Sequence, residues 1–253
     1  MESNHFAAIG FNVKGTYDLE ELVDYAIDNG EVIDLSQWNK GLYIKLALND
    51  GIEFWICINN NEFVTGIPYF RARNTNKISI VENIIDEEWY YESRFVAWAR
   101  DDNVEDYGSV EFPFVFDCPD YVIHSQETIP KITDISITAF ADNIEIYNDI
   151  TTFRETRAED FKLAKKAFIP LGLFEDPDKI ESIPTSNALF TGVVKKAEII
   201  INSLTGNEFY CISVETLSLT IDVIVEKNKL KHMPQENNIV KVYAWVIGDW
   251  MDH

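Results

Sequence analysis

The sequence has few cysteine, glycine, proline and basic residues. Its 253 residues include 3 Cys, 11 Gly and 8 Pro. Three cysteines without a C-x-x-C pair exclude a disulfide framework, and so little Gly and Pro excludes a fibrous or low-complexity protein. Only 21 Lys and Arg stand against 43 Asp and Glu, which gives a formal net charge of −22. This balance argues against nucleic acid and anionic membranes as partners, because both attract an excess of cations.

Long apolar segments are also missing. The longest runs, such as 52–58, are interrupted by a charge and are far shorter than the ~18 residues that a membrane-spanning helix needs. The N-terminus, MESNHFAAIGFNVKG, lacks the basic and apolar regions of a signal peptide. Cys57 and Cys211 lie in strand-like segments, where a thiol usually serves as a small apolar core group. We therefore expect a protein of the reducing cytoplasm.

The sequence does contain enough apolar surface for a folded core. It is 46% hydrophobic and 13% aromatic, a share too high for a disordered acidic tail.

The charge is distributed unevenly along the chain. Residues 1–150 hold 28 acidic and 9 basic residues, a net charge of −19, whereas residues 151–253 hold 15 and 12, a net charge of −3. This asymmetry favours two units with different surfaces.

The first predicted elements are a helix and a hairpin. Apolar residues recur at helical spacing from Leu19 to Ile27, which predicts an amphipathic helix that Thr16 or Asp18 caps at its start and that ends before Gly30. The sequence Asn-Asp-Gly at 49–51 separates two strand-like runs and predicts a hairpin. Further strands are expected at the following positions: 42–48, 52–58, 62–70, 77–85, 94–99, 110–116, 132–140 and 143–147, the last two joined by a turn at Ala141-Asp142.

The second half of the chain repeats the β pattern after an interruption. Residues 160–168 predict a short helix, and three prolines between 169 and 187 indicate a loop or linker. Strands are expected at 188–202, 208–215, 219–226 and 239–247. The predicted fold class is therefore α+β, mainly β. It comprises an acidic antiparallel-sheet domain with one helix (1–150), a helix with a proline-containing linker (151–187) and a small β module (188–253).

Two resemblances follow from these segments. The module 188–253 resembles an OB-like β-barrel, because it has a long first strand with Gly192 near its start, a Thr-Gly turn and a meander followed by a returning strand. It departs from that pattern in having four strands rather than five. The whole chain is similar to a set of uncharacterised bacterial proteins through an NHF-type motif near Phe6 and through the motifs IPYF (67–70), FPFVFDCPDY (112–121) and NSLTG (202–206). That resemblance implies a bacterial origin and the architecture, but no chemistry.

Motifs that would carry catalysis are missing. There is no phosphate-binding loop, no dinucleotide-binding glycine pattern and no G-x-S-x-G. The four histidines, at positions 5, 124, 232 and 253, are scattered singly, and the acidic runs at 86–88 and 101–106 lack the order of a calcium loop. We therefore identify no catalytic residue, no metal ligand and no cofactor.

Four residues are candidates for binding. Arg71 and Arg73 are two apart, so they share a face if the strand continues, and in an acidic domain they could clamp an anion. The alternative is that they pair with the surrounding carboxylates. Tyr243 and Trp245 alternate with apolar residues in the last strand and could stack on bases or a peptide. The alternative is that these two rings pack against the first domain or another subunit.

We weigh three functions. The first is a non-catalytic binding or accessory protein of the bacterial cytoplasm, whose acidic part binds a basic protein partner in the manner of an immunity protein. The second is an enzyme of unrecognised type, a hydrolase that uses paired carboxylates. The third is weak single-strand nucleic-acid binding by the C-terminal module. The lack of an excess of basic residues in that module argues against this function. Association of this chain into a homo-oligomer is a further alternative.

Overall fold

The computed structural model describes residues 5–85, 90–100, 110–155, 163–173 and 183–250. The predicted acidic runs at 86–88 and 101–106 lie outside these residues. The α-helices are α1 (His5–Ala8), α2 (Thr16–Asn29), α3 (Tyr121–His124) and α4 (Ile150–Glu155). The short 3₁₀ segments are η1 (Ser36–Trp38), η2 (Asn49–Gly51), η3 (Tyr90–Glu92), η4 (Leu171–Leu173) and η5 (Lys227–Lys229).

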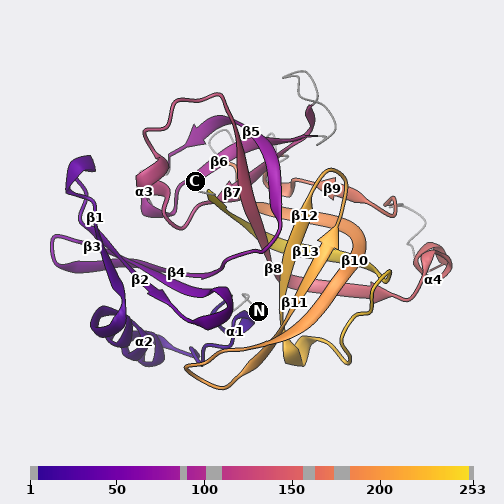
Figure 1. The fold of residues 1–253 in the computed structure, drawn as a ribbon, viewed down its shortest axis with the longest axis horizontal. Helices are drawn as coiled ribbons and strands as arrows, with labels where there is room; N and C mark the ends of the chain where they lie inside the picture. The colour runs from indigo at the N-terminus through magenta and orange to yellow at the C-terminus, as the bar shows by residue number, and fades with distance from the viewer. Residues whose placement is uncertain (1–4, 86–89, 101–109, 156–162, 174–182, 251–253) are drawn as a thin grey trace.

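Strands make up most of the described structure, and Figure 1 shows their arrangement. Their bounds are β1 (Glu31–Asp34), β2 (Leu42–Ala47), β3 (Ile52–Asn59), β4 (Glu62–Phe70), β5 (Thr75–Ile84), β6 (Arg94–Arg100), β7 (Val110–Asp117), β8 (Lys131–Tyr147), β9 (Ala167–Ile169), β10 (Asn187–Ile201), β11 (Glu208–Glu215), β12 (Thr220–Glu226) and β13 (Ile239–Trp250). The predicted class, α+β and mainly β, is confirmed. No helix in the described part of the chain is long and apolar enough to cross a membrane.

The N-terminal sheet contains four antiparallel strands in the order β1-β2-β3-β4. The predicted hairpin is confirmed: Asp50 and Gly51 both have positive φ, 64° and 88°, which this kind of tight turn requires. Helix α2 packs against β2 and β3 through Leu22, Val23 and Ala26, as its periodicity predicts. Gly15, rather than Thr16 or Asp18, occupies the N-cap position, and Asp18 accepts a hydrogen bond of 2.8 Å from the Lys14 backbone N–H.

The second sheet has nine strands in the order β11-β12-β8-β5-β6-β7-β13-β10-β9. Two more pairings, β10 with β11 and β8 with β13, link strands that are not neighbours in that order. β8 pairs with β13 over twelve positions, and β12 pairs with β8 in parallel. The sheet therefore crosses the predicted boundaries at 150 and 187. The division of the chain into folding units at those positions stays a prediction.

Two sequence-based predictions are wrong in their local structure. Residues 132–147 do not turn at Ala141-Asp142, because β8 runs unbroken and Asp142 is the extra residue of a β-bulge opposite Tyr243 and Ala244. The described end of the predicted helix 160–168 is not helical, since Ala167 and Phe168 pair with β10. In both places tertiary pairing overrides a local pattern.

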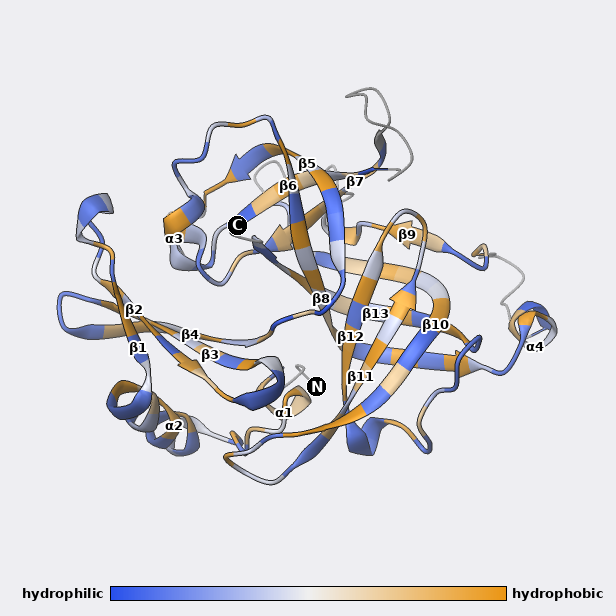
Figure 2. Ribbon diagram, viewed as in Figure 1, coloured by the Kyte–Doolittle hydropathy of each residue, from blue (hydrophilic) through white to orange (hydrophobic). Residues whose placement is uncertain are grey.

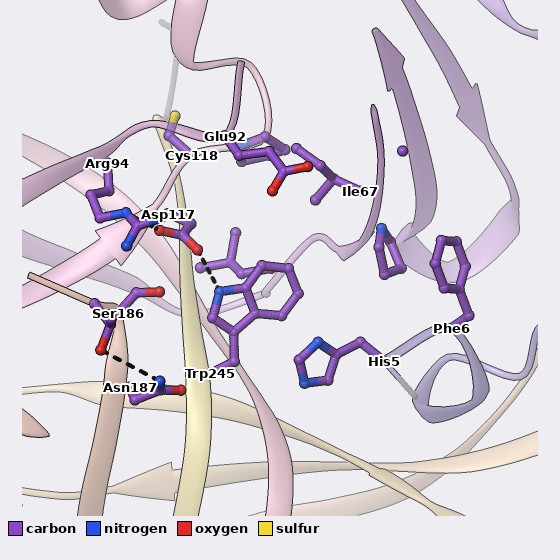
Figure 3. A pocket seen from close by; sticks show the side chains of 15 residues that line it. His5, Phe6, Ile67, Glu92, Arg94, Asp117, Cys118, Ser186, Asn187 and Trp245 are labelled. Atoms are coloured by element: carbon purple, nitrogen blue, oxygen red, sulfur yellow. Dashed lines mark hydrogen bonds and ion pairs between the residues drawn. The ribbon is translucent and has the colours of Figure 1, made fainter. Parts of the chain in front are cut away.

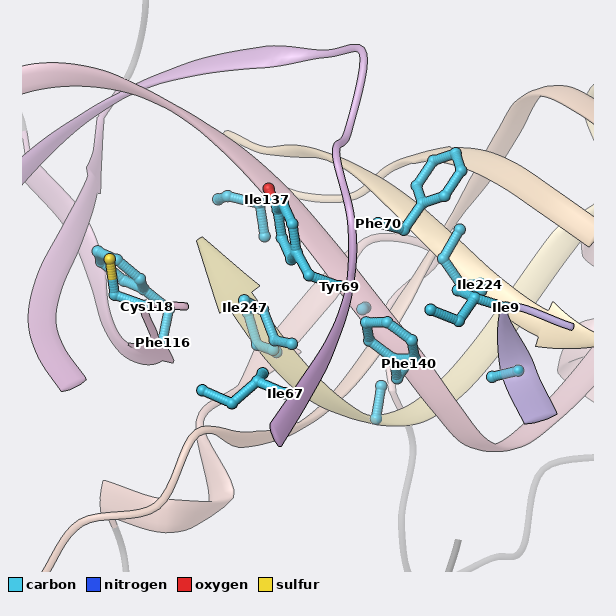
Figure 4. Packing of buried hydrophobic residues seen from close by; sticks show 14 of the residues in the cluster. Ile9, Ile67, Tyr69, Phe70, Phe116, Cys118, Ile137, Phe140, Ile224 and Ile247 are labelled. Atoms are coloured by element: carbon cyan, nitrogen blue, oxygen red, sulfur yellow. The ribbon is translucent and has the colours of Figure 1, made fainter. Parts of the chain in front are cut away.

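One core connects the two sheets. Ile67 and Tyr69 of β4 lie beside Phe140 of β8 and Ile247 of β13, and all four are buried (Figure 4). Figure 2 shows apolar and polar residues alternating along several of the strands, as expected for sheets with a covered face. Because β4 and β13 share this core, the residues at their ends are brought together at the junction of the sheets.

Candidate functional site

A pocket with a cavity volume of about 510 Å³ opens at this junction. It is bounded by α1, β4, the start of β6, the end of β7, the segment before β10, and β13. Figure 3 shows the Trp245 ring in the middle of the pocket, with Asp117 and Arg94 on one side, His5 on another and Glu92 facing the ring. The pocket therefore combines aromatic rings with charged groups of both signs.

The alternation of β13 places Trp245 in the pocket. Val242 and Ala244 are buried in the core, whereas Tyr243 and Trp245 lie on the opposite face, as predicted. Tyr243 is exposed, but only Trp245 lines the pocket. The indole N–H of Trp245 donates a hydrogen bond of 2.5 Å to Asp117 Oδ2. This bond fixes the ring against the end of β7.

Asp117 is the polar centre of the pocket wall. Arg94 Nε lies 3.0 Å from Asp117 Oδ1, and each of the two side chains is 15% exposed. The same guanidinium donates through Nη1 to the Pro184 carbonyl oxygen at 3.0 Å. Burial raises the pKa of the Asp117 carboxyl above its ordinary value, while the Arg94 charge and the Trp245 N–H act in the opposite direction. Because Asp117 has two such partners, it is held firmly in one orientation.

Glu92 brings a second carboxylate to the pocket. It ends η3, two residues before the start of β6, and accepts a hydrogen bond from the Thr65 hydroxyl of β4. The residues that line the cavity thus include two carboxylates, Glu92 and Asp117, and one guanidinium, that of Arg94.

His5 closes the other side. Its ring stacks on Trp245 with a centroid separation of 4.6 Å and an interplanar angle of 18°. His5 Nε2 lies 3.5 Å from Asp142 Oδ1, the carboxylate at the bulge in β8. The bulge thus directs the Asp142 side chain toward His5 at the edge of the pocket. Bulges near functional sites often change the direction of a side chain in this way.

The two predicted arginines lie elsewhere and pair with carboxylates. Arg71 bonds to Glu53, with Nε and Nη2 each 3.2 Å from Oε1, and its Nε is 3.7 Å from Asp249 Oδ2. Arg73 forms an ion pair with Glu198, and its backbone N–H donates to Asp222 at 2.7 Å. Both arginines therefore follow the alternative prediction, in which they pair with surrounding carboxylates. Arg71 and Arg73 as anion ligands stay a prediction.

The structure therefore brings one of the four candidate residues, Trp245, into a pocket with residues that the sequence did not select. Arg94 and Asp117 are separated by 22 residues and pair because β6 and β7 are antiparallel neighbours. A single signal was present: Asp117 follows five mostly apolar residues in FPFVFDC. A lone carboxylate at the end of an apolar strand is worth testing for a buried partner.

No family model, curated protein or solved structure matches this chain. The two resemblances noted in the sequence therefore stay predictions. Among the described residues, no group of three or more His, Cys, Asp or Glu side chains is arranged to hold a metal ion.

Proposed function

We propose that this chain is a non-catalytic binding protein of the bacterial cytoplasm whose partner is a basic protein. The observation that carries the proposal is the acidic surface, which we define as the exposed face of α2 and β1. Six of its acidic residues are exposed, and no lysine or arginine occurs between positions 14 and 40. These residues are Glu20, Glu21, Asp24, Asp28, Glu31 and Asp34.

The acidic surface also exposes apolar groups. Tyr17 is 70% exposed and Val32 is 61% exposed, and both lie among the acids. Tyr17 donates to Glu21, which raises the pKa of the phenol above its ordinary value. Strand β1 is moreover an edge of its sheet. Interfaces typically join aromatic anchors to complementary charge, so this combination supports a protein partner with a basic face.

A pull-down from native bacterial lysate at low and moderate salt tests the proposal. We expect the wild type to capture a partner with an excess of Lys and Arg, which moderate salt releases because exposed charges are screened. A variant with Glu21→Gln, Asp24→Asn and Asp28→Asn should lose it. A matched variant with Glu62→Gln, Glu82→Gln and Glu236→Gln, all at exposed positions, should retain it. No partner at either salt concentration, or equal capture by both variants, contradicts the proposal.

One observation favours a second function. Glu92 and Asp117 line the same pocket, and a hydrolase with paired carboxylates requires two such groups at one substrate site. Burial raises the pKa of the Asp117 carboxyl, which favours the protonated form that a general acid needs, although the Arg94 charge opposes this shift. Turnover of a panel of aryl glycosides and esters by the wild type, abolished by Glu92→Gln, would support the hydrolase. Equal background rates would exclude it for those substrates.

We further propose that the C-terminal module is an OB-like barrel completed from outside its own segment. β10 pairs with β11 and β13, β12 pairs with β11 and β8, and β8 pairs with β13. The strand missing from 188–253 is then β8. A Cys pair at the partners Ala139 and Val223 should form a disulfide under mild oxidation if β8 closes the barrel. Failure to form one contradicts the closure.

A further inference from the structure

We infer that the basic partner binds by adding a strand to the open side of β1. The inference rests on the binding function proposed above and specifies the partner segment: an extended stretch with the pattern basic-apolar-apolar-basic. β1 is the end strand of the N-terminal sheet, and Figure 1 shows it at the outer margin of the molecule. An end strand presents backbone groups with which the strand of a partner can pair.

The hydrogen bonds on both sides of β2 show which groups of β1 are directed outward. In an antiparallel pair, every second residue bonds to the neighbouring strand. The Leu35 N–H donates to the Gly41 carbonyl at 3.1 Å, in line with the register of β1 and β2. On the other side of β2, the Leu48 N–H donates to the Ile52 carbonyl at 2.8 Å, which assigns the even-numbered residues of β2 to β3. Both bonds indicate that the odd-numbered residues of β1 bond to β2.

Val32 and Asp34 therefore direct their backbone groups to the open side. Each residue has one N–H and one C=O, so this side of β1 presents donors and acceptors in alternation. The Val32 side chain is 61% exposed. Asp34 accepts from the backbone N–H and the hydroxyl of Ser36, both at 2.9 Å, and these bonds lower the pKa of its carboxyl. A fixed negative charge thus stands beside an exposed apolar residue at the open side of β1.

The strand at the other end of this sheet is less suited to pairing. β4 contains Pro68, which has no N–H, and its neighbours Ile67 and Tyr69 are buried at the junction of the sheets (Figure 4). β1 contains no proline, and three of its four residues are exposed. Of the two end strands, β1 is therefore the one that an added strand can reach.

The side chains of β1 select the occupant. Its sequence is Glu-Val-Ile-Asp, with two apolar residues between two acids. Directly paired residues of opposite charge stabilise neighbouring strands, whereas like charges destabilise them. An antiparallel pair of two β1 strands, one from a second copy of this chain, would place Glu31 opposite Asp34. A basic-apolar-apolar-basic segment meets both acids in either direction, because the charge pattern of β1 reads the same from both ends.

The end of α2 acts in the same direction. Asp24 and Asp28 are exposed in the last turns of this helix, which ends two residues before β1. No lysine or arginine occurs between positions 14 and 40. The local field therefore attracts a basic segment toward β1 and repels an acidic one.

NMR titration of the full chain with three capped hexapeptides tests the inference. The first peptide is Thr-Lys-Val-Ile-Lys-Thr. The second has the same sequence with N-methyl groups on its Val and Ile nitrogens, which removes backbone donors and keeps both charges. The third replaces both lysines with glutamate. We expect the first peptide to shift the amide resonances of Val32 and Asp34 and to bind about tenfold more tightly than the other two, a difference of about 1.4 kcal/mol.

The outcomes separate the inference from the proposed function. Equal binding of the first and the N-methylated peptide overturns strand addition, while charge attraction to the acidic surface would stand. Equal binding of the glutamate peptide overturns the selection by charge. No binding of the first peptide overturns the inference as well, and the pull-down then decides separately whether a basic protein partner exists.

Two variants place the peptide on β1. Val32→Pro removes an outward N–H and no bond to β2, so it should keep the folded circular dichroism spectrum and weaken the first peptide about tenfold. Val32→Thr is the matched control, because it keeps the N–H and the β-branched shape, and it should bind within about threefold of the wild type. Unchanged binding in folded Val32→Pro, or an equal loss in Val32→Thr, overturns the inference. If Val32→Pro fails to fold, the N-methylated peptide decides on the wild type.

Discussion

Two clusters at the junction of the sheets each combine a tryptophan, a carboxylate and an arginine. In the pocket, Asp117 accepts from Trp245 and pairs with Arg94. In a second cluster, at the end of β4, the buried Glu53 accepts from Trp55 and pairs with Arg71, whose side chain is 50% exposed. The cluster adds one cation and one acid, Lys45 and Asp249. The pocket adds a second acid, Glu92, beside a cavity.

This difference indicates different roles. The Glu53 side chain is 5% exposed and has three donors, which is the environment of a structural ion cluster. Such a cluster contributes little net stability as a whole, but the loss of one member leaves buried charges without compensation. The wall of the pocket instead borders a cavity of about 510 Å³, which admits solvent or a ligand. We therefore expect stability to depend on the cluster more than on the pocket.

The largest expected effect is that of Glu53→Ala. It leaves Lys45 and Arg71 facing each other without their shared carboxylate, so the free energy of unfolding should fall by about 3 kcal/mol. Urea unfolding followed by fluorescence measures it. The exposed control Glu62→Ala should change stability by no more than about 0.5 kcal/mol. A loss that is equally small for Glu53→Ala would show that the cluster is not structural.

The next effect concerns pH. Burial, together with the Asp120 charge, raises the pKa of the Asp249 carboxyl to about 7, although Arg71 opposes this shift. The folded state then binds a proton that the unfolded state releases, so stability falls as the pH rises from about 4 to 7. Between pH 5 and pH 8 the wild type should lose on the order of 2 kcal/mol of unfolding free energy, given that one pKa unit corresponds to about 1.4 kcal/mol.

Asp249→Asn should remove most of that loss. The amide cannot ionise, so we expect the variant to match the wild type near pH 5 and to exceed its stability at pH 8. Urea unfolding at a series of pH values measures the slope. A slope in the variant as steep as in the wild type would assign the pH dependence to groups other than Asp249.

Variants that remove one indole N–H at a time allow a direct comparison of the pocket with the cluster. Trp55→Phe should cost about 2 kcal/mol of unfolding free energy, since it deprives a buried carboxylate of a donor. Trp245→Phe should cost only about 1 kcal/mol, because water in the cavity can replace the lost N–H. Thermal and urea unfolding of both variants provide the comparison. Equal losses of unfolding free energy would mean that water does not replace the indole N–H in the pocket any more than it does in the cluster.

The smallest expected effect is that of His5→Ala. The His5 ring stacks on Trp245 and is 26% exposed, so its removal should cost about 0.5 kcal/mol. His232→Ala, at an exposed position, is the matched control. The two variants should differ in Trp fluorescence more than in unfolding midpoint, because only His5 touches an indole. Identical spectra would contradict the stacking.

Much of the local structure was predictable from the sequence. The helix at 16–29, the hairpin at 42–59 and the two faces of β13 follow from the spacing of apolar residues and from a turn that needs positive φ at Asp50 and Gly51. Trp245 was selected as a binding candidate for the same reason, since it alternates with buried residues. These features depend on residues a few positions apart, whose geometry the backbone fixes locally.

The rest was decided by the tertiary structure. Ala141-Asp142 resembles a turn, but the long pairing of β8 with β13 makes it a bulge and sends Asp142 toward His5. Arg94 meets Asp117, and Trp245 joins them from the other end of the chain, only because β6, β7 and β13 lie side by side. Register between distant strands depends on which faces are buried together, and no local pattern carries that information. The sequence by itself determined an acidic, mainly β protein with an aromatic last strand. The pocket and the balance of its charges came from strand pairing over long distances.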